Sequence, residues 1–387
     1  MENFIFKNET KIIFGKGTEN DAGKEVLKYG GKVLFHYGGG SIKKSGLYEK
    51  IMKSLKESGL TVFELGGVKP NPVVSLIREG IKICRENDID FILAAGGGSV
   101  IDSAKAISMG VNYKGDIWDF FEGKAKLEST VPIGVIVTIP AAGSESSVVT
   151  VITNEDGLIK RGFHSSMLLP KFAILNPELT FTLPVFQIAC GAADILAHTF
   201  ERYFTQSKNV DLTDRLCEGL MKSVIKNSKI AISDLGNYDA MAELMWAGTI
   251  AHNGILGTGR IEDWASHKFG HELSALYGIT HGASLAVMFP AWMKYVYKYN
   301  IERFAQFAAR VFNIDTDFND EERLALKGIK EIENYFKEIG LPTTLKELNV
   351  SSENFELMAQ KAVAKGPIGN FVKISKEDAV KIYELAQ

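Results

Sequence analysis

The sequence has little cysteine, no long apolar run and no strong excess of either charge. Its three cysteines (Cys84, Cys190 and Cys217) lack C-x-x-C spacing, and the odd count argues against a disulfide framework. A formal net charge of −3 gives no reason to expect nucleic acid or a membrane surface as a partner. No apolar stretch reaches the roughly 20 residues of a membrane span, and the first residues lack a signal-peptide pattern. These absences predict a protein of the reducing cytoplasm.

What is present is an ordinary globular composition, with 45% hydrophobic and 24% charged residues, in 387 residues. One hydrophobic core rarely supports a chain of this length, so two domains are expected. Up to residue 183, short apolar runs alternate with helical stretches, which predicts a mainly parallel sheet wrapped by helices. Strands are expected at the apolar runs 32–37, 61–65, 90–99, 134–140 and 171–177, with a hairpin over 148–163.

After residue 183 the pattern changes to long helical periodicities with few β-branched runs. The predicted architecture is therefore an α/β domain over residues 1–183, followed by an all-helical domain over residues 184–387. A cleft between two such halves is a typical place for a ligand.

Two glycine-rich segments follow predicted strands. AAGGGSVID (94–102) places three glycines and a serine before a helix, where free N–H groups and the helix dipole favour a phosphate. YGGGSIKK (37–44) repeats the pattern. The spacing is not G-x-G-x-x-G, and a tight structural turn is the alternative for each loop alone. Two such loops at the carboxyl ends of strands in one sheet nevertheless favour a dinucleotide.

The loop YGGGSIKK (37–44) also bears on cofactor preference. No acidic residue follows the strand 32–37 to accept ribose hydroxyls. Ser41, Lys43 and Lys44 could instead accommodate a 2′-phosphate, which favours NADP over NAD, although lysines at a helix start are commonly just solvated.

A third segment, TIPAAGSESS (138–147), is rich in hydroxyl groups directly after a strand. Thr138, Ser144 and Ser147 could line the phosphate and ribose side of a cofactor, or the segment is a surface loop. Lys160 in the hairpin is either exposed to solvent or turned inward to pair with a phosphate or ribose.

The helical half carries a carboxylate and several imidazoles in a spacing that suits a metal. Asp194 and His198 are four residues apart, as are His267 and His271, so each pair projects from one helix face, and His281 follows in a short turn. Such a set can hold Fe²⁺ or Zn²⁺. Spacing alone favours His267 and His271 as joint ligands, but helical geometry leaves open which of the three later histidines faces the substrate instead. The remaining histidines are interpreted as structural: His36, His164 and His252.

Taken together, GGGSVID, TIPAAGSES, D-x-x-x-H at 194–198 and the spaced histidines of 267–282 resemble the iron-containing (group III) alcohol dehydrogenases over essentially the whole chain. YGGGSIKKSG, ELGGVKPNP and EDWASHKFGHELSA are most similar to the bacterial butanol dehydrogenase and broad-range aldehyde reductase branch. The resemblance implies a dehydroquinate-synthase-like fold and a homodimer. It also implies hydride transfer between nicotinamide C4 and a primary alcohol or aldehyde such as butanol or butanal.

The resemblance also implies a role for individual residues. It makes Asp194, His198, His267 and His281 the ligands of one divalent metal, most typically Fe²⁺ with Zn²⁺ as the alternative, and places His271 near the nicotinamide and substrate. The implied cofactor contacts are Gly97, Gly98, Ser99 and Asp102 for the pyrophosphate, Gly38, Gly39 and Ser41 for the adenosine ribose, and Thr138, Ser144, Ser147 and Lys160 for the remainder. Ala142 stands where the family usually has Thr or Ser, so one hydroxyl contact is missing.

Three other functions are compatible with parts of the pattern. A glycerol-dehydrogenase-like polyol oxidoreductase or a dehydroquinate synthase relative would share the architecture, but a basic cluster for phosphate and carboxylate is lacking around the metal motifs. A metal-dependent hydrolase would leave both GGGS loops unexplained. A noncatalytic metal or nucleotide sensor would bind the cofactor without turning over any alcohol or aldehyde.

Overall fold

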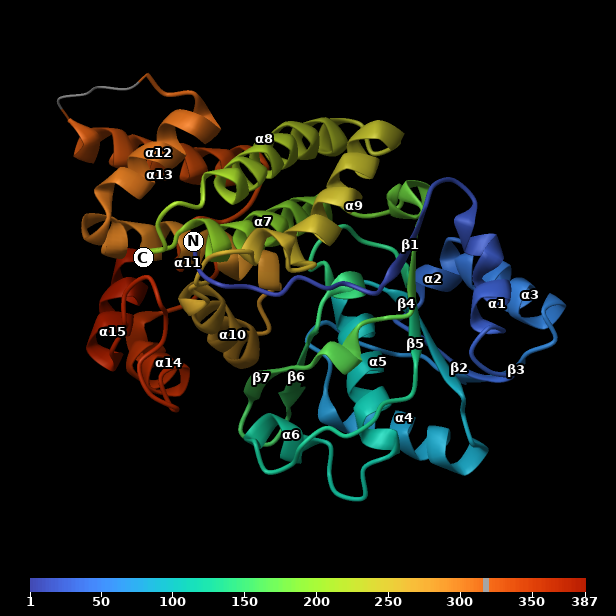
Figure 1. Cartoon of the computed structure of the whole chain (residues 1–387). Coiled ribbons are helices and arrows are strands. Elements are labelled where there is room, and N and C mark those ends of the chain that lie inside the picture. The colour runs from blue at the N-terminus through green and yellow to red at the C-terminus, as the bar shows by residue number, and fades with distance from the viewer. Residues whose placement is uncertain (316–319) are drawn as a thin grey trace. The chain divides into compact units, whose positions relative to one another are not determined.

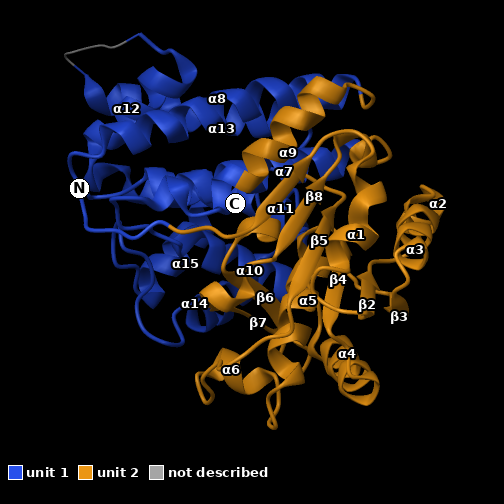
Figure 2. Cartoon of the chain, turned by 45° about the vertical axis from the view of Figure 1, so that its right-hand side comes forward, with its two compact units in different colours: residues 1–6, 184–234, 250–387 blue, residues 7–183, 235–249 orange. Residues whose placement is uncertain are grey.

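The computed structural model describes residues 1–315 and 320–387, which form two compact units (Figure 2). Unit 1 comprises residues 1–6, 184–234 and 250–387, and unit 2 comprises residues 7–183 and 235–249. One of the passages between the units lies between residues 183 and 184, and the domain bounds 1–183 and 184–387 stay a prediction. Two short segments depart from the predicted division, because residues 1–6 belong to the helical unit and residues 235–249 belong to the α/β unit.

Local contacts explain both departures. The amino group of Met1 donates a 2.7 Å hydrogen bond to the carbonyl oxygen of Lys208, within unit 1. In unit 2, Met245 of α9 (Tyr238–His252) belongs to the α/β core, and the Thr249 hydroxyl donates a 2.6 Å bond to buried Glu145. The sequence gives little sign of either contact, because each joins residues that are more than 100 positions apart in the chain.

Unit 2 contains the predicted parallel sheet. Within residues 7–183, all of which are described, six strands pair in parallel in the order β1-β8-β5-β4-β2-β3 (Figure 1). Their bounds are β1 (Lys11–Phe14), β2 (Lys32–Tyr37), β3 (Thr61–Leu65), β4 (Phe91–Gly96), β5 (Ile133–Val137) and β8 (Phe172–Leu175). Strand β1 is not among the predicted strands. The segment 90–99 is predicted as a strand that runs into a loop; the strand ends at Gly96, and Gly98 already begins the following helix.

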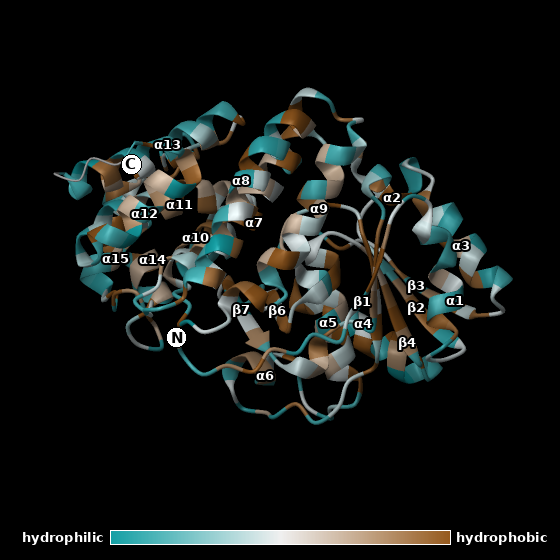
Figure 3. Ribbon diagram, turned by 45° about the horizontal axis from the view of Figure 1, so that its top comes forward, coloured by the Kyte–Doolittle hydropathy of each residue, from teal (hydrophilic) through white to brown (hydrophobic). Residues whose placement is uncertain are grey.

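Helices cover both faces of this sheet. Since successive residues of a strand point to opposite sides, neighbouring residues pack against helices on different faces. Leu34 packs in one cluster with Ile77 of α4 and Ile101 of α5, whereas Phe35 packs in a second cluster with Ile51 of α3. Figure 3 shows the apolar colouring of the strands that results. The helices of this unit are α1 (Ala22–Val26), α2 (Ser41–Lys44), α3 (Leu47–Glu57), α4 (Val74–Asn87), α5 (Gly98–Val111) and α6 (Trp118–Glu122).

The predicted hairpin is present. Strands β6 (Val149–Asn154) and β7 (Ile159–His164) pair antiparallel and are joined through the turn at residues 155–158. Its last residue, His164, is exposed.

One histidine of the sheet supports a pH prediction. His36 in β2 is fully buried, with Nδ1 2.8 Å from the Leu65 carbonyl oxygen and Nε2 2.9 Å from the Ser103 hydroxyl. Burial lowers the pKa of His36 to about 4. The unfolded chain takes up this proton near pH 6.5, so the stability that the neutral ring contributes is complete above that pH and lost as the pH falls toward 4.

We therefore expect the wild type to lose about 3 kcal/mol of unfolding free energy at pH 4 relative to a His36→Gln variant, referenced to their difference at pH 7.5. Urea denaturation of both proteins across this range measures the effect. Parallel pH profiles for the two proteins would contradict it.

Unit 1 is helical, as predicted for the second half of the chain. Its helices are α7 (Val185–Tyr203), α8 (Asp211–Ser233), α10 (Ala265–Tyr277), α11 (His281–Val296), α12 (Ile301–Phe312), α13 (Glu321–Glu338), α14 (Phe355–Ala362) and α15 (Lys376–Leu385). Its core is rich in aromatic contacts between α7, α11 and α12, made by Phe200, Phe204, Phe289, Trp292, Phe304 and Phe307. Among residues with described positions, no helix combines the length and apolar character needed to cross a membrane.

Candidate functional site

Helix α7 supplies two of the predicted metal ligands. Asp194 and His198 lie one turn apart on the same helix face, and both residues are 5% exposed. Oδ1 of Asp194 lies 3.4 Å from Nδ1 of His198. The spacing in the sequence therefore brings these two side chains together as predicted.

The remaining histidines come from two successive helices. His267 and His271 project from α10, and His281 is the first residue of α11. Gly282 lets α11 start close to α7, because a Cβ at this position would collide with the backbone of Cys190, one turn before Asp194. This close approach places the His281 Nε2 atom 3.9 Å from Oδ1 of Asp194.

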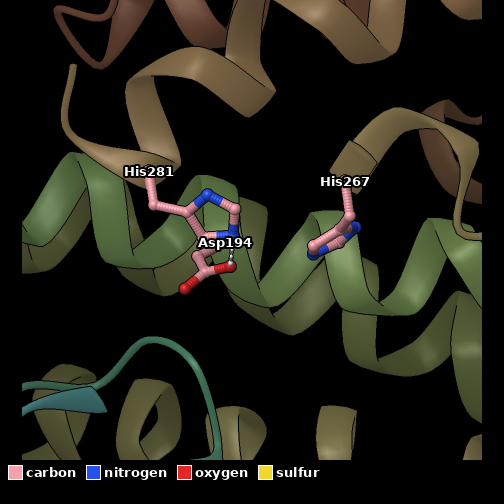
Figure 4. Close-up of side chains that lie close together, drawn as sticks. All are labelled: Asp194, His267 and His281. Atoms are coloured by element: carbon pink, nitrogen blue, oxygen red, sulfur yellow. Dashed lines mark ion pairs between the residues drawn. The ribbon is translucent and has the colours of Figure 1, made fainter. Parts of the chain in front are cut away.

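Asp194, His267 and His281 form a cluster in which each offers one ligand atom, and these atoms lie within 4.8 Å of one another (Figure 4). His198 and His271 both lie outside this group, although the ring centroid of His271 is 5.5 Å from that of His281. The group contains His267 and His281 rather than the pair His267 and His271 that spacing favoured, and the full set of ligands stays a prediction. His281 belongs to the group as the first residue of α11, which residues 278–280 separate from the end of α10.

The residues present fit a divalent metal. Nδ1 of His198 is buried and makes no hydrogen bond of normal geometry to any described residue. The ring centroid of His198 is 4.8 Å from that of His267. Burial, followed by the nearby His267 and Arg202, holds the pKa of His198 well below its usual range, so the ring is neutral, which is the form that binds metals. One carboxylate and neutral imidazoles are a common ligand set for iron or zinc.

Three neighbours of this cluster lie outside the predicted ligand set. His252, interpreted as structural, packs its ring 4.1 Å from the ring of His198, and the Trp264 ring lies 5.0 Å from that of His267. Glu201, also on α7, is 1% exposed and contacts His267. Burial raises the pKa of Glu201 to about 8, while N–H donors from His267 and Trp264 act in the opposite direction. Glu201 is seven residues after Asp194 and so shares its helix face, which is a signal that the sequence did contain.

The predicted dinucleotide loops lie in unit 2. Gly38 and Gly39 follow β2, and Ser41 begins α2. Gly97 precedes α5, with Gly98 and Ser99 in its first turn, and a helix N-terminus of this kind favours an anion; a phosphate contact there stays a prediction. A Cβ at Gly97 would collide with Ile139, which explains why this position excludes a side chain. The backbone N–H of Thr138 donates a 3.1 Å hydrogen bond to the carbonyl oxygen of Gly96, the last residue of β4.

A buried lysine that the sequence reading missed holds the hydroxyl-rich loop after β5. Lys105 of α5 is 0% exposed, and its ammonium donates to the carbonyl oxygens of Ser144 (2.7 Å), Ser147 (2.8 Å) and Val149 (2.8 Å). It also donates a 3.1 Å bond to the Ser144 hydroxyl. Burial lowers the pKa of Lys105 to about 8, while two nearby carboxylates act in the opposite direction.

Those carboxylates belong to Asp102 and Glu145. Asp102 accepts a 2.6 Å bond from the Ser144 hydroxyl and a 3.0 Å bond from the Val151 N–H. Both Asp102 and Ser144 thus connect α5 to this loop, and their contacts with a cofactor stay a prediction.

Lys160 is turned inward rather than exposed to solvent, and these were the two orientations that the sequence left open. It is 9% exposed, and its ammonium donates a 2.8 Å bond to the side-chain oxygen of Asn71. At the position where the family usually has a hydroxyl, Ala142 faces the start of α5, since a Cβ on Gly98 would lie 3.0 Å from the Ala142 methyl.

Comparison with known proteins assigns this architecture to a family. Residues 9–177 match the model of the iron-containing alcohol dehydrogenases, and residues 188–387 match the C-terminal model of the same family. The chain is 44% identical over 385 residues, covering 99% of both chains, to the probable NADH-dependent butanol dehydrogenase 2 of Bacillus subtilis. It is 37% identical, over 100% of both chains, to the NADPH-dependent aldehyde reductase YqhD of Escherichia coli.

A solved structure agrees with these relationships. The NADH-dependent butanol dehydrogenase A of Thermotoga maritima superposes with a TM-score of 0.96 at 40% identity, covering 100% of this chain and 99% of the other. The fold, the clustered carboxylate and histidines, and full-length similarity to these enzymes lead to one assignment: the chain belongs to the iron-containing alcohol dehydrogenase family.

Proposed function

We propose that this protein is a metal-dependent, NAD(P)-linked alcohol dehydrogenase and aldehyde reductase that interconverts a small primary alcohol and its aldehyde, with butanol and butanal as the expected pair. The observation that carries the proposal is the cluster of Asp194, His267 and His281, with His198 beside it, in a chain that matches butanol dehydrogenases along its whole length. The predicted ligands are these four residues. A hydrolase would use a similar metal site but would not need the two glycine-rich loops.

The chemistry divides between the two cofactors and the protein. A bound divalent metal supplies Lewis-acid polarisation of the substrate oxygen. A nicotinamide dinucleotide supplies or accepts the hydride. The protein must in addition move a proton, because alcohol oxidation releases one. His271 is the residue proposed for this role: it is 8% exposed, lies one turn after His267 and sits beside His281 without joining the close group of ligand atoms.

The dinucleotide is proposed to bind the loops of unit 2 through Gly38, Gly39, Gly97, Gly98 and Ser99, with Thr138, Ser147 and Lys160 contacting its remainder. For the choice between NADP and NAD, β2 ends in glycines rather than an acidic residue, which supports a place for a 2′-phosphate near Ser41. Lys43 lies close by, with its ammonium 4.8 Å from the ring centroid of Tyr48. The named relatives include both NADH-dependent and NADPH-dependent enzymes.

We also propose a cytoplasmic homodimer. A reducing compartment is supported by the three cysteines, all within described residues, which are buried and unpaired. The dimer is supported only by resemblance to the family.

The decisive experiment is an activity screen on metal-free protein reconstituted separately with Fe²⁺ and Zn²⁺. Each form is supplied with NADH or NADPH and with butanal or shorter aldehydes, and the loss of absorbance of the reduced cofactor is followed. We expect turnover that depends on added metal and on aldehyde. Cofactor binding without turnover under every combination would contradict the proposal and favour a sensor.

A further inference from the structure

A buried carboxylate on α7 contacts the candidate metal centre from outside the predicted ligand set. Glu201 follows His198 by three residues and Asp194 by seven, so all three project from one face of the helix. The residue is 1% exposed. Burial of a carboxylate is costly unless donors surround it, and the nitrogen atoms that face Glu201 belong to the segment that starts α10.

Two backbone N–H groups and one ring nitrogen face this carboxylate. Oε1 accepts a 3.1 Å bond from the backbone N–H of His267 and lies 2.7 Å from Nδ1 of the same residue. Oε2 accepts a 2.5 Å bond from the backbone N–H of Trp264. The two backbone N–H groups require an acceptor at each oxygen of Glu201, so the hydrogen shared between Glu201 and His267 is expected on Nδ1 of the imidazole.

This contact decides which nitrogen of His267 can bind a cation. A neutral imidazole carries one hydrogen, and if Nδ1 holds it, the lone pair is on Nε2. Metal-binding histidines commonly donate their other N–H to a carboxylate, which fixes the tautomer and the ring orientation.

We propose that Glu201 is a positioning residue that fixes His267 as a metal ligand through Nε2. This inference rests on the proposed function only in requiring that the cluster binds a divalent metal. It adds a fifth side chain to the centre, one that touches a ligand rather than the metal.

The same carboxylate holds the backbone that carries His267. Trp264 precedes α10 with a φ of 70°, a left-handed conformation that bulky side chains adopt rarely. The bonds from Glu201 to the N–H groups of Trp264 and His267 satisfy two donors at the start of α10 that no helical carbonyl can reach. Ring and backbone of His267 are thus fixed by one residue.

The test measures metal affinity rather than activity. Metal-free wild type and the variants Glu201→Met and Glu201→Gln are titrated with Zn²⁺ in competition with a chromophoric chelator. The methionine removes every acceptor at similar length, so we expect about 10–100-fold weaker Zn²⁺ binding. The glutamine keeps a carbonyl oxygen that can accept the Nδ1 hydrogen, but its NH₂ group then faces the Trp264 N–H, which is also a donor. The Zn²⁺ affinity of Glu201→Gln is therefore expected to lie between those of the wild type and Glu201→Met.

Glu262→Gln is the matched control. Glu262 accepts a 2.6 Å bond from the side-chain nitrogen of Trp264 and pairs with Arg202, so this variant is expected to bind Zn²⁺ as the wild type does. A folded Glu201→Met protein with wild-type affinity would overturn the inference, as would an equal loss of affinity in the control.

A second measurement decides the matter even if Glu201→Met does not fold. Long-range ¹H–¹⁵N spectra of the ¹⁵N-histidine-labelled, Zn²⁺-loaded wild type report which ring nitrogen carries the hydrogen. We expect the Nδ1–H form at His267, and the Nε2–H form would overturn the inference while leaving the proposed function intact. A wild type that binds no divalent metal would instead overturn the proposed function, and this inference with it.

Discussion

Replacing His281 with alanine is expected to abolish tight metal binding and to lower aldehyde turnover by about 10³-fold or more, since metal polarisation of the substrate oxygen contributes several kcal/mol. The alanine removes a ring whose Nε2 lies 3.9 Å from the Asp194 carboxylate and leaves that acid without one of its neighbouring imidazoles. Elemental analysis after dialysis against a mild chelator measures the bound metal. Oxidation of NADH or NADPH with butanal measures turnover.

His271→Ala is the matched comparison, because His271 lies on the neighbouring helix α10 and its ring is 5.5 Å from that of His281. We expect this variant to keep its metal near the wild-type level and to lose turnover, in line with a role in proton transfer. Full activity of His281→Ala would refute its assignment as a ligand. Loss of metal in His271→Ala would contradict the division of roles between the two histidines.

Replacing Lys105 with methionine is expected to lower the free energy of unfolding by about 3–5 kcal/mol, the range found when one partner of a buried ionic network is removed. The ammonium is fully buried and donates to three carbonyl oxygens and a hydroxyl. Without it, these acceptors and the carboxylates of Asp102 and Glu145 lose their cation. Because the acceptors belong to the loop after β5, dinucleotide affinity should fall as well.

Chemical denaturation of metal-free protein measures the stability, and quenching of tryptophan fluorescence by NADH measures the affinity. Lys53→Met on α3 is the surface control, since its side chain is 74% exposed and pairs only with Glu57 across one helical turn among the described contacts. The control is expected to change stability by less than about 0.5 kcal/mol. A Lys105→Met protein as stable as the control would show that the buried network contributes little.

Much of the fold follows from local patterns. The buried strands 32–37 and 91–96 are continuous apolar runs, because both of their faces are covered by helices, and such runs stand out from the polar loops around them. Strand β1 escaped prediction because it is a four-residue edge strand with a partly exposed pattern. Its place depends on pairing with β8, more than 150 residues later, which no local window of sequence contains.

The site divides in the same way. The pairing of Asp194 with His198 is a property of one helix, so spacing alone predicts it. The choice between His271 and His281 depends on how α11 packs against α7, and only resemblance to a family indicated it. Glu201 and Lys105 look like ordinary helix charges in the sequence. Their burial comes from tertiary packing: the spacing of Glu201 from Asp194 places it on the same helix face but does not establish that it is buried, and Lys105 has no such signal.

The division of the chain into units has a consequence for synthesis on the ribosome. The polypeptide passes from one unit to the other after Phe6, Leu183, Asp234 and Thr249. The chain leaves the ribosome from its N-terminus onward. The α/β unit is therefore still incomplete when residue 183 leaves the exit tunnel, because Met245 of its core has yet to be made. Until the helical segments are translated, the first six residues have no partners within their own unit, since the carbonyl oxygen that accepts the hydrogen bond from the Met1 amino group belongs to Lys208.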